Sequence, residues 1–318
     1  MKIAIVTLGR IGDMILTTPA FSAIKRKFPS AELYVIAGRK NYSVLAGNPH
    51  VNAVIPFDKS LLGLMRMLYF LAKHHFDYWI VPKDHKSHES QLLAKFARAD
   101  VKIGFNFENH NAFTHTIPSD NENATLHFTE RIFNSLAFLD IPLPQSLRPE
   151  LYLSDTAQAK ARNFYSALPA KHNLLLNLSA TSSIRIYSAE NWERVLSSLD
   201  ADRFNIVLTF MPSEVKIADS LIAKFPQIVI GETRSLGDYF ALIKYCDCLI
   251  TPDTSAVHVA SAFEKNTIAL FTDHERNTNS FRPTNPNATL LVEPGVSSTI
   301  NGISPKRIAA EIKRIFAL

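Results

Sequence analysis

Cysteine is scarce in this chain of 318 residues, which excludes a fold built on disulfides. Cys246 and Cys248, which are expected at i and i+2 of one strand, are too few for a disulfide framework. We therefore expect both to be reduced packing residues. We also expect no secretory signal, because residues 1–6 lead directly into a strand and its loop. The most apolar predicted helix, Leu61–Ala72, is short and carries Arg66, so it is not expected to span a membrane.

Signatures of two large functional classes are missing as well. The sequence has no helix-turn-helix, zinc-finger or RNP pattern, so no nucleic-acid partner is predicted. The net charge of +5 and the pI near 9.1 are compatible with an anionic substrate, with a negatively charged membrane surface, or with no particular partner. The segment Gly9-Arg-Ile-Gly12 does not match G-x-G-x-x-G, and Ala37-Gly-Arg-Lys40 places no acidic residue for a ribose. A dinucleotide dehydrogenase is therefore disfavoured.

Short β-prone runs alternate with helical patterns through both halves, which favours an α/β fold with parallel sheets. The predicted strands are Lys2–Thr7, Leu33–Ile36, Val54–Phe57, Tyr78–Val81, Val101–Phe105, Leu174–Leu178, Ile206–Thr209, Ile228–Ile230, Cys248–Thr251 and Thr267–Phe271. Two doubly wound, Rossmann-like domains facing each other across a cleft would account for this pattern. The predicted parts are an N-terminal domain at 1–153, a linker at 154–173, a C-terminal domain at 174–302 and a final helix at 303–318.

Two loops of the first half carry candidate functional groups. Asp13 follows the first strand, where its carboxylate is either a helix cap or a catalytic group projecting from the carboxyl edge of the sheet. The polar loop 82–90 follows another strand and is either a solvated surface loop or a binding site for a charged acceptor. His85 and His88 stand three residues apart, but without a third convincing ligand they do not predict a metal site.

Two loops of the second half resemble phosphate-binding segments. Loop 179–187 combines small hydroxyl residues with Arg185, which suits a phosphate, although an ordinary Ser/Thr-rich loop has the same composition. Pro252 is expected to end the strand Cys248–Thr251, and Asp253 and Thr254 favour a helix start beyond it. Such a start offers free N–H groups to an anion such as a diphosphate, but it can also be a simple cap.

Two segments resemble motifs of a known family. Gly12-Asp-Met-Ile-Leu-Thr-Thr-Pro-Ala20 and Pro252-Asp-Thr-Ser-Ala-Val-His-Val-Ala260 are similar to segments of the lipopolysaccharide heptosyltransferases and their relatives, glycosyltransferase family 9, which have the GT-B architecture. The resemblance covers nearly the whole chain. It implies that Asp13 is the general base that deprotonates the acceptor hydroxyl.

The resemblance also implies two sets of binding residues. The donor nucleotide sugar would be held by Thr181, Ser182, Arg185, Glu214, Ser235, Asp253, Thr254, Ser255, Ala256 and His258, with Glu214 at the ribose and Ser235 at the adenine. The acceptor would be contacted by Gly12, Arg39, Lys83, His85 and Lys86.

The implied activity is an inverting, metal-independent transfer without a cofactor, from a nucleoside-diphosphate sugar such as ADP-heptose to a lipid-linked lipopolysaccharide or lipooligosaccharide core. The implied location is the cytoplasm, with peripheral binding to the inner leaflet. Ser255 stands where the family usually has glycine, and Ile186-Tyr187-Ser188 also departs from its pattern. These departures leave two alternatives open: a transferase with another donor, and a nucleotide-sugar-binding protein without turnover.

Overall fold

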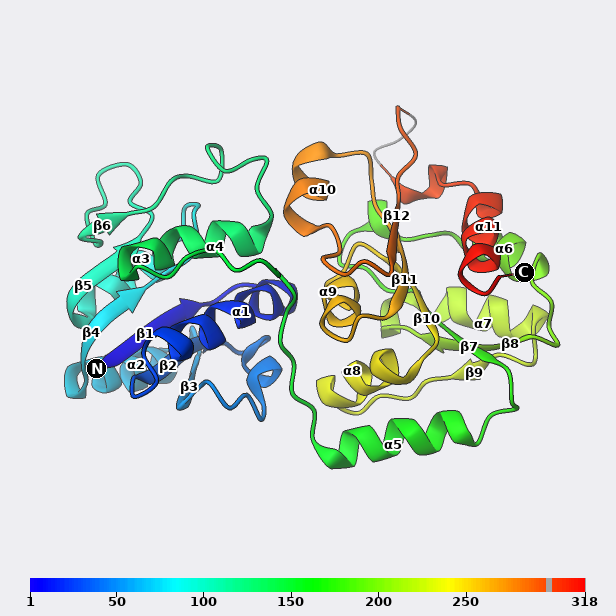
Figure 1. Cartoon of the computed structure of the whole chain (residues 1–318), viewed down its shortest axis with the longest axis horizontal. Coiled ribbons are helices and arrows are strands. Elements are labelled where there is room, and N and C mark those ends of the chain that lie inside the picture. Colours follow the sequence, from blue (N-terminus) through cyan, green and yellow to red (C-terminus); the bar gives the residue numbers. More distant parts are fainter. Residues whose placement is uncertain (296–298, 318) are drawn as a thin grey trace. The chain divides into compact units, whose positions relative to one another are not determined.

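The chain folds into two compact units, residues 1–152 and 153–318 (Figure 1). The computed structural model describes residues 1–295 and 299–317. Each unit contains a six-stranded sheet, and every strand pairing in the described residues is parallel. Parallel sheets need helices on both faces, because βαβ connections cover them. The prediction of two doubly wound α/β domains is confirmed.

The N-terminal sheet has the order β3-β2-β1-β4-β5-β6. Its strands are β1 (Lys2–Thr7), β2 (Glu32–Gly38), β3 (Ala53–Phe57), β4 (His75–Ile80), β5 (Arg98–Gly104) and β6 (His115–Thr116). Its helices are α1 (Ile11–Lys27), α2 (Leu61–Lys73), α3 (His88–Phe96) and α4 (Phe128–Leu136). Helix α1 packs against α4, whereas α2 packs against α3. Met67 of α2 and Leu93 of α3 share one core cluster with Val6 and Trp79 of the sheet.

The C-terminal sheet has the order β12-β11-β10-β7-β8-β9. Its strands are β7 (His172–Asn177), β8 (Phe204–Thr209), β9 (Val229–Ile230), β10 (Cys248–Pro252), β11 (Asn266–Leu270) and β12 (Ala288–Leu291). Its helices are α5 (Asp155–Ser166), α6 (Ala189–Ser197), α7 (Val215–Lys224), α8 (Leu236–Tyr245), α9 (Ser255–Ala262), α10 (Glu275–Phe281) and α11 (Pro305–Ile315). Helix α8 packs between α5 and α9, and α6 packs between α7 and α11.

Both sheets have a point where the strand order reverses. In the N-terminal sheet it lies between β1 and β4, and in the C-terminal sheet it lies between β7 and β10. Ligands of doubly wound sheets bind outside the carboxyl ends of the strands at these switch points. The loops that follow β1, β4, β7 and β10 are therefore where a site is expected.

Serine and threonine side chains set the starts of many helices. Their hydroxyls accept hydrogen bonds from first-turn amides, which lack partners inside the helix. Such N-caps begin α2 (Ser60), α3 (Ser87), α5 (Ser154), α6 (Ser188), α8 (Ser235) and α9 (Thr254). Ser235 and Thr254 thus have a structural role in addition to the binding role predicted for them.

Helix α1 contains Pro19 in its interior, and a neighbouring threonine compensates for it. Proline has no N–H, so the carbonyl oxygen of Ile15 loses its helical donor. The Thr18 hydroxyl donates to this oxygen at 2.7 Å and accepts from the backbone N–H of Glu150 at 2.7 Å. The Thr-Pro pair of the N-terminal segment is therefore explained by helix geometry.

Two predictions about local structure were wrong, whereas Pro252 ends its strand as predicted and pairs with Leu270 of β11. This is possible because pairing with β7 stops at Ile250, so the missing N–H of Pro252 costs no ladder bond there. Cys246 lies at the C-cap of α8 instead of on a strand, where its thiol donates to the Ile243 carbonyl oxygen. Residues 88–90, assigned to a loop, begin α3.

Both cysteines are free and fully buried, as predicted. Burial raises the pKa of the Cys246 thiol to about 12 and also raises that of Cys248. Thiolates are the reactive form, so these two groups are inert packing residues. Within the described ranges, no helix is both long enough and apolar enough to cross a bilayer.

Candidate functional site

Asn177, the last residue of β7, connects the two sides of the C-terminal switch point. Its Nδ2 donates to Thr251 Oγ1 on β10 at 2.9 Å and to Thr254 Oγ1 at 3.3 Å. Thr254 in turn caps α9 by accepting from the Ala256 N–H at 3.3 Å. The first turn of α9, which begins with Ser255, therefore starts directly at the switch point. A helix start in this place favours an anion.

A cation is fixed beside this helix start. Arg185 lies in the 3₁₀ turn Ser183–Arg185, and its Nη1 is 3.0 Å from Oδ2 of Asp253. Its Nη2 donates to Asn277 Oδ1 at 3.1 Å, and Asn277 Nδ2 donates to Asp253 Oδ2 at 2.6 Å. The Asp253 side chain is buried, whereas that of Arg185 remains 21% exposed. Arg185 is thus held in place while part of its side chain stays accessible.

The other predicted donor residues differ in their burial and contacts. Glu214 is buried, and its Oε2 accepts from the Ser179 hydroxyl at 2.6 Å, so it anchors the loop after β7. Thr181 is exposed and Ser182 precedes the 3₁₀ turn, accepting from the Arg185 N–H at 3.0 Å. His258 is buried within α9, its ring 6.2 Å from that of Phe281.

A pocket of about 280 Å³ opens at the carboxyl ends of β8 and β9. Its lining residues are Thr209, Phe210, Ile230, Gly231, Glu232, Thr233 and Arg234. Ser235, the predicted adenine contact, follows directly in the chain and caps α8 by accepting from the Asp238 N–H. Four of the seven lining residues, Thr209, Glu232, Thr233 and Arg234, are polar or charged, so the pocket offers hydrogen-bonding groups beside the apolar Phe210 and Ile230.

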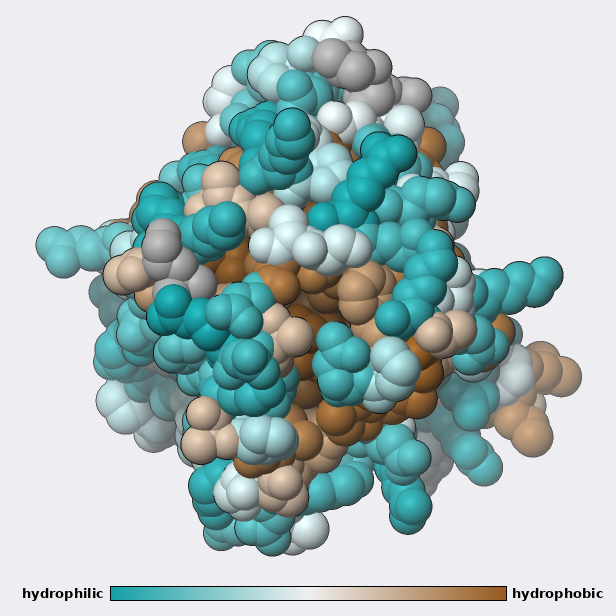
Figure 2. Space-filling model, turned by 90° about the vertical axis from the view of Figure 1, so that its right-hand side faces the viewer, coloured by the Kyte–Doolittle hydropathy of each residue, from teal (hydrophilic) through white to brown (hydrophobic). Residues whose placement is uncertain are grey.

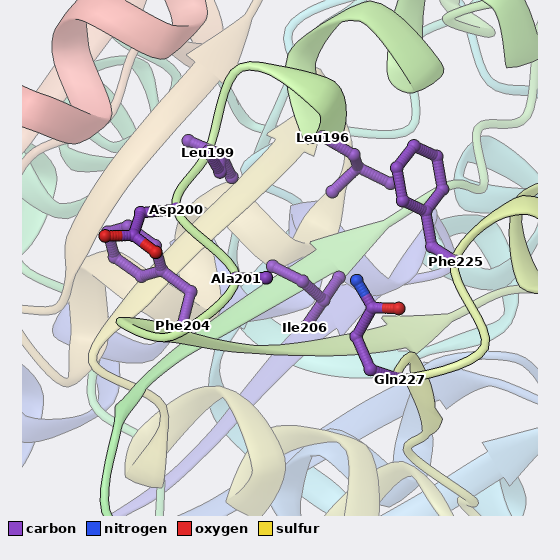
Figure 3. A pocket seen from close by; sticks show the side chains of 8 residues that line it. All are labelled: Leu196, Leu199, Asp200, Ala201, Phe204, Ile206, Phe225 and Gln227. Atoms are coloured by element: carbon purple, nitrogen blue, oxygen red, sulfur yellow. The ribbon is translucent and has the colours of Figure 1, made fainter.

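A second, smaller pocket is formed at the opposite edge of the same sheet. It holds about 20 Å³ between the amino end of β8 and the ends of α6 and α7 (Figure 3). The side chains that face one another across it include Leu196, Phe204, Ile206 and Phe225. Figure 2, which views this side of the C-terminal domain, shows apolar side chains inside a ring of hydrophilic ones. The volume fits one water molecule, so this pocket is too small for a nucleotide or a sugar.

In the N-terminal domain, Asp13 is fixed at the start of α1. Its Oδ2 accepts from the backbone N–H of Arg10 at 2.8 Å. A Cβ on Gly9 would lie 2.1 Å from this oxygen, so any other residue there would push the Asp13 carboxylate out of this position. Asn41 Nδ2 holds the same loop by donating to the carbonyl oxygens of Thr7 and Gly9 at 3.1 and 3.0 Å. Asp13 therefore caps the helix with one oxygen, while its Oδ1 has no hydrogen-bond partner in residues 1–295 and 299–317.

Sequence reasoning missed the roles of Gly9 and Asn41. The residue predicted to act in this loop was Gly12, as an acceptor contact, and Gly12 lies in the first turn of α1. The role of Gly9 could have been found from its position, because it directly precedes Arg10, the N-cap of α1. Asn41 stands 34 residues from Thr7, and nothing in the sequence indicated that contact.

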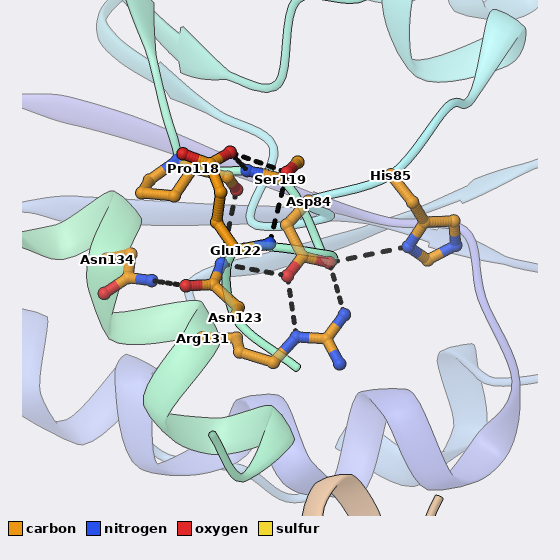
Figure 4. A network of polar contacts seen from close by, with 8 residues as sticks. All are labelled: Asp84, His85, Pro118, Ser119, Glu122, Asn123, Arg131 and Asn134. Atoms are coloured by element: carbon orange, nitrogen blue, oxygen red, sulfur yellow. Dashed lines mark hydrogen bonds and ion pairs between the residues drawn. The ribbon is translucent and has the colours of Figure 1, made fainter. Parts of the chain in front are cut away.

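The loop after β4 contains a buried ion pair (Figure 4). Asp84 is 1% exposed and receives two hydrogen bonds of 2.6 Å from Nε and Nη2 of Arg131 on α4. Asn123 donates to the same carboxylate at 3.2 Å, and His85 Nδ1 lies 3.5 Å from it. Burial by itself raises the pKa of Asp84, but hydrogen bonds from His85, Arg131 and Asn123 and the charge of Arg131 lower it to about 2. Asp84 is therefore ionised and fastens this loop to α4.

The predicted acceptor residues follow β1, β2 and β4, which are adjacent strands, so they gather at one edge of the sheet. Several of them already face carboxylates. Arg39 Nη1 lies 3.0 Å from Asp58 Oδ2, and Lys86 Nζ lies 2.6 Å from Glu108 Oε1. Lys83 is half-buried. In the part of the chain that the structure describes, no three His, Cys, Asp or Glu side chains are placed to hold a metal ion.

The sequence profile of glycosyltransferase family 9 (heptosyltransferase) matches residues 65–300. The chain belongs to this family. Lipopolysaccharide heptosyltransferase 3 of Escherichia coli K12 is 27% identical over 292 residues, covering 83% of this chain and 80% of that protein. The family matches the resemblance found in the sequence, and the prediction of a glycosyltransferase is confirmed.

Solved structures of the family share the fold. A family 9 glycosyltransferase from Veillonella parvula has a TM-score of 0.87 at 20% identity, covering 99% of this chain and 97% of that one. The E. coli ADP-heptose lipopolysaccharide heptosyltransferase II has a TM-score of 0.82 at 20% identity, covering 100% and 99% of the two chains. The protein therefore has the GT-B fold of the heptosyltransferases, as predicted. Asp13 lies before residue 65, outside the segment that the family profile matches.

Proposed function

We propose that this family 9 enzyme is an inverting heptosyltransferase that moves heptose from ADP-heptose to a sugar of a lipopolysaccharide or lipooligosaccharide core. The donor and the acceptor are suggested by the names of its relatives, a lipopolysaccharide heptosyltransferase and an ADP-heptose lipopolysaccharide heptosyltransferase. The observation that carries the proposal is the arrangement of Arg185 and Asp253 beside the start of α9. This arrangement combines a fixed cation with a helix N-terminus, and both stabilise a leaving diphosphate.

Asp13 is proposed as the general base. The acceptor hydroxyl oxygen forms a bond to the anomeric carbon of the donor, and its proton passes to Asp13. The bond between the anomeric carbon and the diphosphate oxygen breaks with its electron pair on ADP. A single displacement from the opposite face inverts the anomeric configuration. The Arg10 N–H fixes the orientation of the Asp13 carboxylate, which leaves Oδ1 to receive the proton.

The donor is proposed to bind along the carboxyl edge of the C-terminal sheet. Thr181, Ser182 and Arg185 would contact the diphosphate, together with the amides of Ser255 and Ala256. The pocket beyond β8 and β9, which ends at Arg234, would take the adenosine. Ser255 has ordinary helical backbone in α9, so the serine is tolerated without backbone strain.

Glu214 and His258 are proposed to position other residues and not to contact the donor directly. Both are buried, and Glu214 already holds Ser179, so we assign them to positioning the loop and helix that meet the donor. The acceptor would be lipid-linked and would meet the cations of the N-terminal domain. Arg39, Lys86 and His85 would then exchange carboxylate partners of this chain for phosphate or carboxylate groups of the acceptor. The enzyme would work in the cytoplasm, at the inner leaflet of the membrane.

Nucleotide binding tests the donor assignment. ADP and ADP-heptose should raise the melting temperature without magnesium, because a ligand of the folded state stabilises it. Stabilisation by uridine or guanosine nucleotides alone would contradict the proposed donor and favour another nucleotide sugar. Transfer to a core oligosaccharide, with the anomeric configuration of the product read by NMR, tests the reaction. Tight donor binding without transfer to any core acceptor would instead indicate a nucleotide-sugar-binding protein.

A further inference from the structure

Helix α2 exposes large apolar side chains to solvent. Leu61, Leu62, Met65 and Tyr69 are 75, 66, 58 and 68% exposed. Leu62, Met65 and Tyr69 are spaced at i, i+3 and i+7, which places them on one side of the helix. Leu71 is buried on the other side, against the sheet. Single exposed apolar residues are normal, but a contiguous group of them marks an interaction surface.

The neighbouring helix α3 extends this surface. Helices α2 and α3 pack side by side on the same face of the N-terminal sheet, and an ion pair between Lys59 and Glu89 joins their starts. On α3, Leu92 and Phe96 are 42 and 53% exposed, and their i, i+4 spacing places them together. We call the surface formed by Leu61, Leu62, Met65, Tyr69, Leu92 and Phe96 the α2–α3 face.

The charges around the α2–α3 face are mostly of one sign. Residues 59–73 and 88–98 contain five Lys or Arg residues and a single carboxylate, that of Glu89. The cations are Lys59, Arg66, Lys73, Lys95 and Arg98, and all five are exposed. Glu89 is already paired with Lys59. Lys73 Nζ lies 5.8 Å from the centre of the Tyr69 ring, so cation and aromatic ring are presented together.

The composition of the α2–α3 face favours a membrane surface over a protein as its partner. Aliphatic and aromatic side chains flanked by Lys and Arg are typical of helices that lie in a membrane interface. Lysine is depleted at protein–protein interfaces, so the three exposed lysines beside the apolar side chains, Lys59, Lys73 and Lys95, argue against a protein partner. Anionic headgroups attract such cations, and the apolar side chains can enter the boundary between headgroups and acyl chains.

We propose that the α2–α3 face docks the enzyme on an anionic membrane surface. The apolar side chains insert at the acyl boundary, and the five cations contact the headgroups. The proposal rests on the proposed function in one respect, because the lipid-linked acceptor of that function would be anchored in the membrane to which the enzyme binds. The docking itself depends only on α2, α3 and their flanking cations.

Vesicle co-sedimentation tests the proposal. The full chain should bind vesicles of phosphatidylcholine mixed with phosphatidylglycerol, bind pure phosphatidylcholine more weakly, and dissociate as salt is raised. The double variant Leu62→Glu/Met65→Glu and the charge variant Arg66→Glu/Lys73→Glu should each weaken binding about tenfold or more. Phe138→Glu is the matched apolar control, since Phe138 is 43% exposed outside this face, and Lys27→Glu on α1 is the charge control. Both controls should bind like the unmodified protein.

Absence of binding to the anionic vesicles, or equal losses in the controls, would overturn the proposal. Circular dichroism and melting temperatures of the variants exclude unfolding as the cause of a loss. Transfer to a delipidated core oligosaccharide in vesicle-free buffer should be unchanged by the α2–α3 substitutions. If vesicle binding behaves as expected but this transfer fails in the unmodified protein, the docking surface stands and the proposed function does not. If transfer proceeds and vesicle binding fails, the proposed function stands and the docking surface does not.

Discussion

Arg185 and Asp253 form an ion pair of 3.0 Å across the switch point of the C-terminal sheet. The two residues are 68 positions apart, one in the loop after β7 and the other after β10. Asp253 is buried, and Asn277 donates a further hydrogen bond of 2.6 Å to its carboxylate. We infer that Asp253 holds the Arg185 side chain ready for an anion, so that less side-chain freedom is lost when the ligand binds.

Removal of this arginine tests the diphosphate site. Arg185→Ala should raise the Kd for ADP by about 10- to 100-fold, because hydrogen bonds to charged groups contribute about 1.5–3 kcal/mol. Isothermal titration calorimetry measures the change. Arg194→Ala, an exposed arginine on α6, is the control and should leave the Kd unchanged. Unaltered ADP affinity in Arg185→Ala would place the diphosphate elsewhere.

Asp13→Asn tests the proposed general base. The asparagine amide oxygen can still accept from the Arg10 N–H, so the start of α1 should remain intact. The amide cannot take the acceptor proton, so kcat should fall by about 10²–10⁴-fold while ADP affinity stays the same. Asp100→Asn, at an exposed aspartate of the same domain, serves as the control. A fall in kcat of less than about tenfold would remove Asp13 from this role.

The pair of Asp84 and Arg131 predicts a large effect on stability. Asp84→Asn leaves the Arg131 guanidinium buried without its counter-charge, which should lower the free energy of unfolding by about 3–5 kcal/mol. Urea denaturation at neutral pH measures this loss. The exposed pair of His75 and Asp100 provides the comparison, and Asp100→Asn should shift the urea midpoint little.

The same carboxylate predicts a dependence of stability on pH. The pKa of Asp84 is about 2 in the folded protein against 3.8 ordinarily, so the folded state holds the ionised form more strongly. A lowered carboxyl pKa stabilises the fold fully above the ordinary value, and this contribution is lost as pH falls from about 4 to 2. Urea midpoints measured across that window should decline less steeply in Asp84→Asn than in the unmodified protein. Parallel declines in the two proteins would contradict the assignment.

Thr18→Val tests the compensation for Pro19. Valine has nearly the shape of threonine but leaves the Ile15 carbonyl oxygen and the Glu150 N–H without this partner inside a buried region. The free energy of unfolding should fall by about 1–3 kcal/mol. Thr156→Val, on the exposed side of α5, is the matched control and should have almost no effect. Equal urea midpoints for the two variants would show that the Thr18 hydroxyl is dispensable.

The sequence predicted the alternation of strands and helices because its signals are local. Buried parallel strands appear as short β-prone runs, and Ser or Thr caps with following apolar periodicity mark helix starts. Where these signals are weak, the prediction failed. Helix α10 and strand β12 were not predicted, since residues 275–281 carry mainly polar side chains and residues 288–291 form only a short run.

The sequence by itself determined the two α/β domains and the candidate residues at the carboxyl ends of their strands, because chain order and periodicity fix which residues follow each strand. The tertiary structure alone decided how these residues are held. The contacts from Asn177 to Thr251, from Arg185 to Asp253 and from Asp84 to Arg131 join residues that are 47 to 74 positions apart. Such pairings depend on the order of strands in the sheet, which places distant loops side by side, and no local pattern in the chain encodes that order.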